Sequence, residues 1–382
     1  MMTLDATVVD DDRRLLRETV RSFVEAKVEP NSKAIDENGK IPREIYQALT
    51  EMGLNAPTVP ANYGGGGASM VDSAILIEEM AKGSAAVALI LAQNLAGVAA
   101  VVAGRNGQFK SDLLSRVANG TSLLVWSTDS FEDKTEMLAS VDGGGIVLNG
   151  KLHWIPSFDF GAKLVLIAEV KVQAESRLVA IDIASPHSGR INEGPLESDL
   201  GLMGSCLKSL TLENVVVTTE EIIATSEDNA LAFKAFRSVA QVALAAQANG
   251  IATAALRHAH IYALERHQFG VPISDFESTR TILGTMALNL EAARQLTFAA
   301  AAQLDSHRPG WGNRDSIAVD AGSKWFASKV AVEVAIDAIQ IFGGYGFVKD
   351  YPVERLMRDA KMTQLMAGSN QILEIANALL LS

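Results

Sequence analysis

Two segments of the chain carry residues suited to holding a phosphate-bearing ligand. Arg266 opens the stretch 266–270 (Arg-His-Gln-Phe-Gly), which follows a long apolar helical pattern. A planar guanidinium can hold a pyrophosphate through paired, charge-assisted hydrogen bonds. Gln340 precedes Gly343 and Gly344, where glycine lets a backbone approach a ligand closely and glutamine offers both a donor and an acceptor. An exposed helix-terminal arginine and a glycine helix cap are the structural alternatives.

Other polar residues are less specific. Ser369 and Gln371 follow a glycine at the start of the last predicted helix, where Ser369 could serve as the helix N-cap or as a ligand contact. Cys206 is the only cysteine, so the chain can form neither an intrachain disulfide nor a thiolate metal cluster. His258 and His260 are two residues apart and point to different faces of a helix, which makes them a poor pair of metal ligands.

The composition of the 382-residue chain limits its function. A net charge of -12 without long runs of one sign argues against nonspecific nucleic-acid binding, which needs clustered lysine and arginine. The first residues are acidic and polar, unlike a signal peptide. The most apolar stretch, 85–102, contains Gln93 and Asn94 and predicts a buried core helix rather than a membrane span. We therefore expect a soluble cytoplasmic protein that does not bind membranes.

The elements that must position these residues fall into three regions. Residues 1–120 show apolar positions at helix spacing, interrupted by prolines and by the glycine run 64–67. Residues 121–220 contain short β-branched runs between turn-forming stretches and predict a small antiparallel β-domain. Residues 221–382 contain long alanine-rich helical segments, among them 353–366, joined by short loops, which predict an antiparallel four-helix bundle. The fold class is therefore mainly α with a central β-domain.

Five stretches, in order along nearly the whole chain, resemble the acyl-CoA dehydrogenase family of flavoproteins. They are 59–67 with 78–81, 148–151 with 154–155, 201–205 before 212–215, 266–273 with 276, and 340–346 continuing through 351–354 to 357–361. The resemblance implies an N-terminal helical domain, a β-barrel-like domain and a C-terminal four-helix bundle, assembled as a tetramer. It also implies α,β-dehydrogenation of an acyl-CoA thioester, with FAD bound partly across a subunit interface and electrons leaving to an electron-transfer flavoprotein.

The resemblance assigns cofactor roles to particular residues. Those matching the family's contacts to the ADP half of the neighbouring subunit's FAD are Arg266, Phe269, Gln340, Gly343 and Gly344. Those matching contacts to the chain's own FAD are Thr128 and Trp154 at the flavin ring, and Ser369 and Gln371 at the adenosine and diphosphate.

The residues expected to act on the substrate depart from the family's pattern. Ala367 lies in the stretch 364–369 (Gln-Leu-Met-Ala-Gly-Ser), where the family usually has the glutamate base. A thioester α-proton needs a positioned base, which alanine does not supply. In members that carry the base on the helix matching 238–250, its position corresponds to Ala240 here, and the usual arginine after it is Gln241. In a third arrangement, an acid or an arginine lies on the helix matching 88–94, where this chain has only Ala, Leu, Ile, Gln and Asn.

The flavin side of the pocket has also changed. The family's Thr-Glu-Pro-x-Ala-Gly-Ser-Asp stretch is replaced by 128–133 (Thr-Asp-Ser-Phe-Glu-Asp), where added carboxylates would repel an anionic CoA thioester. After Trp154 and Ile155, Pro156 replaces the usual threonine and has neither a hydroxyl nor a backbone donor.

The pattern of loss suggests a division of labour. Residues that match contacts to a neighbour's FAD remain, whereas several that serve the chain's own flavin and substrate have gone. Bacterial α2β2 acyl-CoA dehydrogenases, some of which act on fatty-acyl or steroid side-chain thioesters, resemble this arrangement. We hypothesise that the chain pairs with a glutamate-bearing subunit. The alternatives are an active homotetramer with a relocated base, such as Glu132 or Asp133, and a flavin monooxygenase-like member of the fold.

Overall fold

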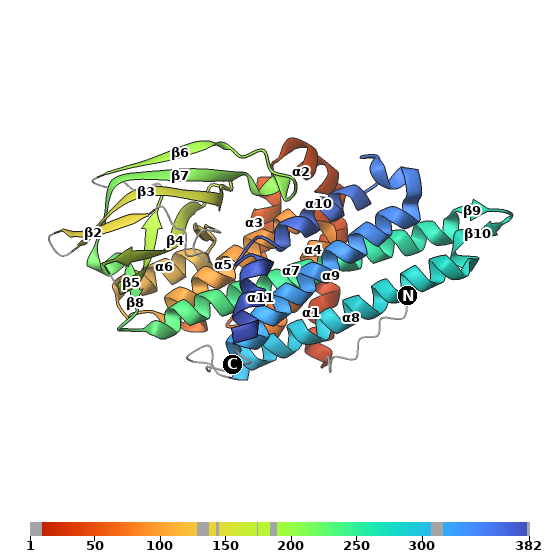
Figure 1. The fold of residues 1–382 in the computed structure, drawn as a ribbon. Coiled ribbons are helices and arrows are strands. Elements are labelled where there is room, and N and C mark those ends of the chain that lie inside the picture. Colours follow the sequence, from red (N-terminus) through yellow and green to blue (C-terminus); the bar gives the residue numbers. More distant parts are fainter. Residues whose placement is uncertain are drawn as a thin grey trace.

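The computed structural model of the chain describes residues 10–127, 137–142, 145–173, 175–183, 189–306 and 316–379. A β-domain lies at one end of the molecule, and long helices run from it to the opposite end, where the β9–β10 hairpin projects (Figure 1). The order along the chain is helical, then β, then helical, as the sequence predicted. The mainly α fold class with a central β-domain is thereby confirmed.

The N-terminal region contains six α-helices among the described residues. They are α1 (Asp11–Phe23), α2 (Ser32–Asn38), α3 (Arg43–Glu51), α4 (Met70–Gly83), α5 (Ala85–Ala103) and α6 (Gln108–Ala118). Polar residues mark the helix starts, because their side chains satisfy backbone N–H groups that have no partner inside the helix. Asp10 accepts from the Arg13 amide, Ser69 and Asp72 form a reciprocal capping box, and Ser84 accepts from the Val87 amide.

Short helical turns connect these and later elements. They are the π-helix η1 (Val24–Val28) and the 3-10 turns η2 (Glu29–Asn31), η3 (Ala61–Tyr63), η5 (Met203–Ser205), η6 (Thr219–Glu221), η7 (Ile273–Asp275) and η8 (Gly343–Phe347).

Three helical segments are long and apolar enough to cross a membrane by length and composition alone: Ala85–Ala103, Ala230–Glu265 and Val319–Phe347. In each of the first two, 94% of the most apolar window is buried inside the protein, against 44% in the third. The prediction that 85–102 forms a core helix is confirmed, since this helix is surrounded by other parts of the chain.

The β-domain consists of two four-stranded sheets. One has the order β1-β4-β5-β8 (Ser122–Trp126, Lys163–Val172, Glu175–Asp182, Ile222–Thr225), and the other has the order β2-β3-β7-β6 (Leu138–Asp142, Gly145–Pro156, Leu207–Val217, Arg190–Leu196). All neighbouring strands in them are antiparallel except β1 and β4, which run parallel. The chain leaves the first sheet after β1, forms β2 and β3 in the second, and returns, and this long excursion permits parallel pairing.

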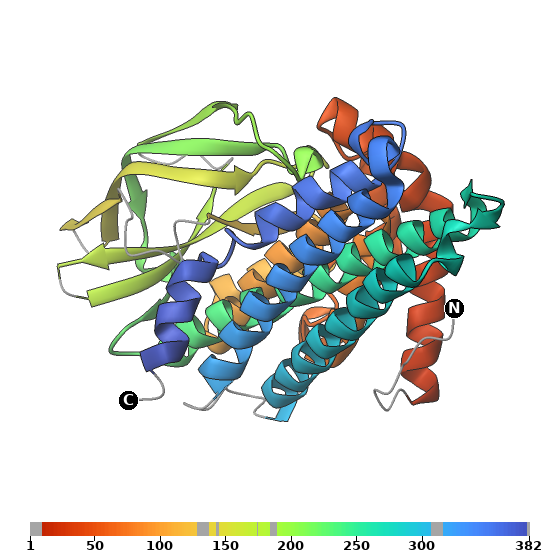
Figure 2. The ribbon, with the colours of Figure 1, turned by 45° about the vertical axis from the view of Figure 1, so that its right-hand side comes forward.

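The C-terminal region is built on α7 (Ala230–Glu265), α8 (Glu277–Ser306) and α9 (Ser316–Phe342), with α10 (Val353–Thr363) and α11 (Asn370–Leu379) packed on α9. The long helices lie side by side in both ribbon views, and the short strands β9 (His267–Gln268) and β10 (Val271–Pro272) close the turn between α7 and α8 (Figure 2). The sequence pattern predicted a helix over 353–366. The helix ends earlier, at Thr363, because the Gln364 and Leu365 amides donate to carbonyls three residues before them; Ala367 and Gly368 then adopt positive φ, at 52° and 91°.

The loop before η5 joins the three regions. A Cβ added to Gly201 would lie 2.4 Å from the carbonyl oxygen of Arg358, so the loop packs directly on the backbone of α10. The Leu202 amide donates to the buried Asp359 carboxyl at 2.7 Å. Burial raises the pKa of Asp359 to about 6. The Arg358-Asp359 pair is thus a structural junction between the β-domain and the bundle.

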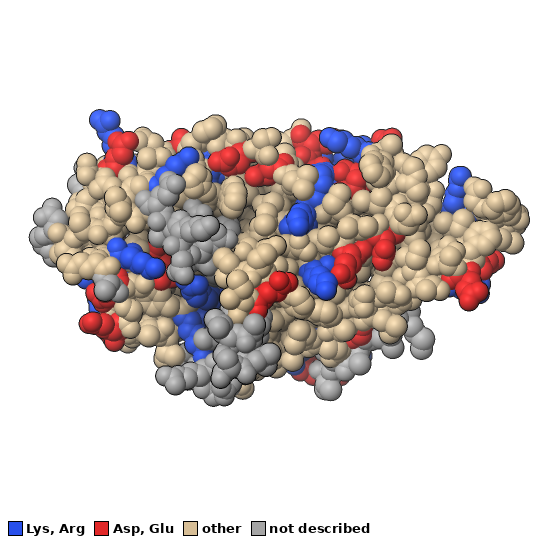
Figure 3. Space-filling view, viewed as in Figure 1, with Lys and Arg blue, Asp and Glu red and all other residues tan. Residues whose placement is uncertain are grey.

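Charged side chains are interspersed on the face drawn in Figure 3. Acidic and basic residues alternate there with uncharged surface, and they form no continuous basic stripe on that face.

Candidate functional site

A cavity of about 500 Å³ lies at the far end of the bundle, where α7 ends and α9 passes into η8. Arg266 and Gln268 line it from the α7 end, and Gly343, Gly344 and Tyr345 line it from η8. Arg266 alone is charged among the lining residues, all of which lie in the described part of the chain. The structure therefore brings together two sequence segments that were predicted to bind a phosphate-bearing ligand.

The glycines leave the cavity open. Gly343 has φ 61°, in the left-handed region that favours glycine, and a Cβ added to either Gly343 or Gly344 would meet no atom within 4 Å. The space above this backbone is therefore free for a ligand, and the arginine guanidinium stands beside it. This is the arrangement that a diphosphate needs.

Aromatic rings form the wall of the cavity. The Tyr262 and Phe342 rings stack with centroids 4.2 Å apart, and the Arg266 guanidinium carbon lies 5.8 Å from the centroid of the Tyr345 ring. A guanidinium over an aromatic face is attracted by the negative face of the ring. Tyr345 thus helps to hold Arg266 at the cavity, a contribution that the sequence pattern did not predict.

Two further predicted contacts lie at the same end but outside the cavity lining. Phe269 has φ 54° and is 94% exposed at the tip of the β9–β10 hairpin, and Gln340 is exposed on the last turn of α9. Phe347, 85% exposed, adds a second apolar ring nearby in η8. Exposed large aromatic side chains around an open cavity are typical of a surface that another chain covers.

The residues predicted to face the chain's own flavin lie elsewhere. Trp154 is near the end of β3, a strand of the β-domain, and this domain lies on the opposite side of the molecule from the β9–β10 hairpin (Figure 1). It has φ 52°, is 40% exposed and falls in a register irregularity between Leu152 and Ile155. Pro156 is buried and pairs with Leu207 of β7. Thr128, like Glu132 and Asp133, lies outside the described residues.

Ala367 lies in the loop between α10 and α11, where its side chain is completely buried. Its left-handed backbone is unusual for alanine and costs on the order of 1–2 kcal/mol relative to an ordinary conformation. Ser369 follows as the half-buried residue before α11, and its carbonyl accepts the Leu373 amide at 3.1 Å, as expected at a helix N-cap. Gln371 is exposed on the first turn.

The other two positions considered for a base are also buried and lack a carboxylate. Ala240 on α7 is fully buried, and Gln241 beside it is nearly so. On α5, the Gln93 side-chain oxygen accepts the Trp126 amide at 2.7 Å, and that of Asn94 accepts the Leu124 amide at 3.0 Å. These two amide side chains fasten α5 to β1, which explains polar residues in an otherwise apolar helix.

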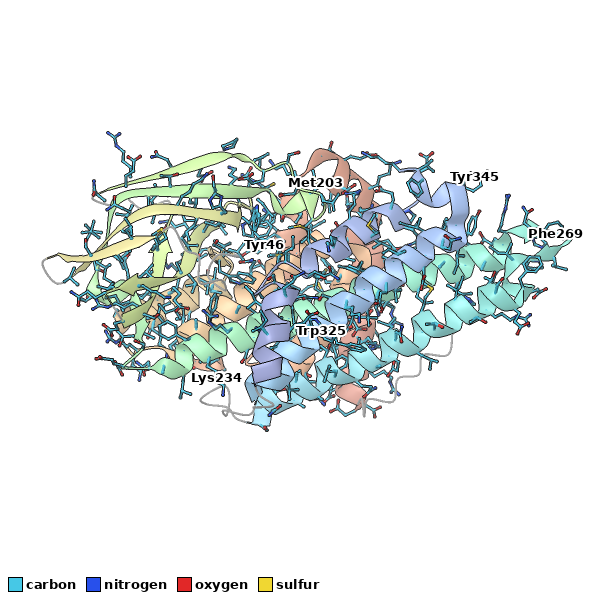
Figure 4. All side chains as sticks on the ribbon, in the orientation of Figure 1. Tyr46, Met203, Lys234, Phe269, Trp325 and Tyr345 are labelled. Atoms are coloured by element: carbon cyan, nitrogen blue, oxygen red, sulfur yellow. The ribbon has the colours of Figure 1, made fainter. Side chains whose placement is uncertain are left out.

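Phe269 and Tyr345 lie together at the tip of the molecule, whereas Trp325, on the α9 segment next to α11, lies much farther along the bundle (Figure 4). The cavity at Arg266 is therefore remote, within one chain, from the α10–α11 loop and from the β-domain. In a single copy of this chain, the cavity at Arg266 therefore lies apart from Trp154, Ser369 and Gln371, the described residues of the other set.

Two buried charged residues on α9 were missed by the sequence analysis. Lys324 and Asp320 are both completely buried one helical turn apart. Burial lowers the pKa of Lys324 to about 7 and raises that of Asp320 to about 7. A lysine within an alanine-rich amphipathic pattern gave no signal of burial, because long cationic side chains usually reach solvent.

Comparisons with known proteins identify the family of the chain. A family model described as the acyl-CoA dehydrogenase N-terminal domain matches residues 10–121, and one described as the C-terminal domain matches residues 233–379. A probable acyl-CoA dehydrogenase of Mycobacterium leprae is 33% identical over 373 residues, which cover 96% of this chain and 95% of that protein.

Solved structures show the same fold. Butyryl-CoA dehydrogenase of Megasphaera elsdenii superposes with a TM-score of 0.87 and 27% identity, covering 97% of this chain and 98% of that one. A chain in a structure of the electron transferring flavoprotein of Acidaminococcus fermentans superposes with a TM-score of 0.86 and 28% identity, covering 97% and 98%.

Proposed function

The chain belongs to the acyl-CoA dehydrogenase family, and we propose that it acts there as the subunit of a hetero-oligomer that completes a partner's FAD site without supplying the catalytic base. The observation that carries the proposal is the contrast between two places in one chain. The position of the base holds the buried methyl group of Ala367, while the cavity at Arg266 and Gly343 is open.

FAD, the cofactor of this family, fits the residues at that cavity. Arg266 is placed to pair with the diphosphate, and the backbone at Gly343 and Gly344 leaves room for the adenosine side. The isoalloxazine ring of FAD supplies the acceptor for a hydride from the acyl chain. This chain contributes to that chemistry by binding and orienting the ADP half of FAD. A base on another subunit removes the α-proton.

The assembly follows from the separation of the two sets of contacts. Because the cavity at Arg266 is remote from the β-domain, the FAD that it holds must meet its flavin-side residues on another chain. Phe269 and Phe347, which stand exposed beside the cavity, offer an apolar surface for that chain to cover. We propose a tetramer of this chain with a glutamate-bearing acyl-CoA dehydrogenase subunit.

The partners and location follow as further parts of the proposal. The substrate class is an acyl-CoA thioester, of a fatty acid or a steroid side chain, and electrons pass to an electron-transfer flavoprotein. A cytoplasmic location suits a chain whose one cysteine forms no intrachain disulfide.

Co-expression tests the proposal. The chain should be purified alone and together with the product of a neighbouring gene that encodes the glutamate-bearing subunit, and bound flavin should be measured per chain. We expect little flavin on the chain alone and restored flavin and dehydrogenase activity in the complex. A flavin-replete homo-oligomer that reduces its FAD with an acyl-CoA would instead favour a relocated base. Substrate-dependent oxygen consumption with supplied reduced flavin would favour monooxygenase-like chemistry.

A further inference from the structure

We propose that Lys324 of α9 is the positioning residue of the loop between α10 and α11, and that it imposes the shape of this loop whatever side chain stands at position 367. The inference rests on the proposed function in one respect: the loop leads to Ser369 and Gln371, which are predicted to contact FAD. The contacts themselves stand independently of any ligand.

The Lys324 ammonium engages both ends of the loop. Its Nζ donates to the Gly368 carbonyl at 2.7 Å, to Asn370 Oδ1 at 3.0 Å and to the Gln364 carbonyl at 3.2 Å. An ammonium group has three donors, so these three oxygens satisfy it. The interaction links α9 to Gln364, the first residue after α10, to Gly368, the residue after Ala367, and to Asn370, the first residue of α11.

Below its pKa of about 7, Lys324 is an ammonium ion that neutral oxygens hold. Lys324 is completely buried, and the hydrogen-bond partners of its Nζ in the described part of the chain are two backbone carbonyls and one side-chain amide oxygen. A buried charge is expensive unless hydrogen bonds compensate it, and here the compensation comes from the loop itself. A change in the loop conformation would therefore leave the Lys324 ammonium buried without hydrogen-bond partners. The loop conformation and the burial of this charge thus stabilise each other.

Asn370 forms a second layer around the ammonium. Its Nδ2 donates to Ser328 Oγ at 3.0 Å, and its backbone amide donates to the Gln364 carbonyl at 3.0 Å. The Gln364 carbonyl therefore accepts from both Lys324 and Asn370 and closes the loop on itself. Each polar contact in this network comes from α9 or from the two ends of the loop, and the residue 367 side chain takes part in none of them.

The backbone strain shows why such a clamp is needed. Ala367 and Gly368 are consecutive left-handed residues, and alanine adopts this region only where its surroundings impose it. The methyl group of Ala367 contributes no hydrogen bond, so its surroundings impose the conformation: the contacts of the loop to Lys324 and the bond from the Asn370 amide to the Gln364 carbonyl. The loop can thus lose its functional side chain and keep its form.

Hydrogen–deuterium exchange tests the inference in the purified full-length chain. Lys324→Met removes the donors and keeps much of the side-chain volume. Lys329→Met is the matched control, because Lys329 is exposed on the same helix and only faces the Trp325 ring, 5.4 Å from its centroid. We expect amides in 364–370 to exchange about tenfold faster or more in Lys324→Met, with no change in Lys329→Met or in the β-domain. Equal exchange in the two variants overturns the inference.

Variants at Asn370 keep the test decisive if Lys324→Met fails to fold. Asn370→Ala removes one of the three acceptors and should raise exchange in 364–370 by a smaller factor. Asn370→Asp puts a carboxylate opposite the ammonium and should match or exceed the wild-type protection. Unchanged exchange in Asn370→Ala overturns the inference.

Flavin content separates this inference from the proposed function. In the co-expressed complex, Lys324→Met should lower bound flavin along with the faster exchange, and Lys329→Met should not. Faster exchange with unchanged flavin would leave the positioning role of Lys324 intact and count against the cofactor role of Ser369 and Gln371.

Discussion

Arg358 of α10 donates to both carboxylate oxygens of Asp36 in α2, at 3.0 Å and 2.7 Å. The same guanidinium donates to Glu354 one turn earlier on α10 and to the Leu200 carbonyl at 3.1 Å. A two-point contact between a planar guanidinium and a carboxylate fixes direction as well as distance. One side chain therefore fixes the N-terminal helices, the loop before η5 and the bundle in one arrangement.

Asp36→Asn should destabilise the protein, because Arg358 would keep its charge in a mostly buried setting with a weaker partner. We expect the free energy of unfolding, measured in urea, to fall by about 1–3 kcal/mol. The control is Glu37→Gln, since Glu37 pairs only loosely with Lys33 at 3.8 Å and the two side chains are 50% and 56% exposed. Equal losses in the two variants would show that the Asp36 contact has no special role.

Gly201→Ala should also destabilise the protein. The added methyl group would lie 2.4 Å from the Arg358 carbonyl oxygen and 2.7 Å from the Asp359 nitrogen, both of them backbone atoms that cannot rotate away. Overpacking of this kind costs about 1–3 kcal/mol. Gly107→Ala is the comparison, because a Cβ there would meet nothing within 4 Å. A wild-type midpoint of urea unfolding in Gly201→Ala would contradict the close packing of this loop on α10.

Asp320 should give the stability a distinct pH dependence. Burial raises its pKa from 3.8 to about 7, against the opposing effects of the Ser238 hydroxyl and of Lys234. Between about pH 4 and 7 the folded protein therefore holds a proton that the unfolded chain has released. The folded state binds more protons in this window, so this group's contribution to the free energy of unfolding falls as the pH rises.

Asp320→Asn should remove that slope and stabilise the protein at pH 8 by about 1–3 kcal/mol, because a buried carboxylate no longer has to ionise. Asp350→Asn serves as the control, since that side chain is 85% exposed. Urea unfolding at pH 5 and pH 8 gives the comparison. A variant that is less stable than the wild type at pH 8 would show that the Asp320 carboxylate is well paired.

Arg266→Ala should lower flavin retention in the co-expressed complex without affecting the fold. Loss of a charge-assisted contact to the diphosphate should weaken FAD binding by about 10-fold to 100-fold. Arg266→Lys should restore only part of the binding, because lysine keeps the charge but not the planar fork. Arg14→Ala, at an exposed arginine of α1, is the control. Full flavin content in Arg266→Ala would contradict the assignment of the cavity.

The sequence predicted the order of the three regions because each region has its own hydrophobic period, and that period is a local property. The sequence also predicted that Arg266 and Gly343 serve one ligand, because both lie in stretches that resemble the family's contacts to the ADP half of FAD. The end of α10 at Thr363 was not predictable. There the Gln364 carbonyl accepts from Lys324 of α9 and from the Asn370 amide, and neither contact is visible in the local pattern.

The burial of charged residues was not predictable from the sequence. Lys324 and Asp320 look like ordinary charged residues of an amphipathic helix, and only the packing of α9 against α7 and the α10–α11 loop shows that they are buried. The role of Tyr345 likewise follows only from the structure, in which its ring lies beside the Arg266 guanidinium. These relationships join residues far apart along the chain, and local patterns carry no record of them.

Anaerobic photometry of the flavin tests the central claim most directly. The chain is reconstituted with FAD, alone and in complex with its glutamate-bearing partner, and each sample is titrated with butyryl-, octanoyl- and palmitoyl-CoA and with a steroid side-chain CoA thioester. We predict that the absorbance band of the oxidised flavin bleaches in the complex and stays unchanged in the chain alone, because Ala367 supplies no base. Bleaching of the flavin in the chain alone would contradict the account.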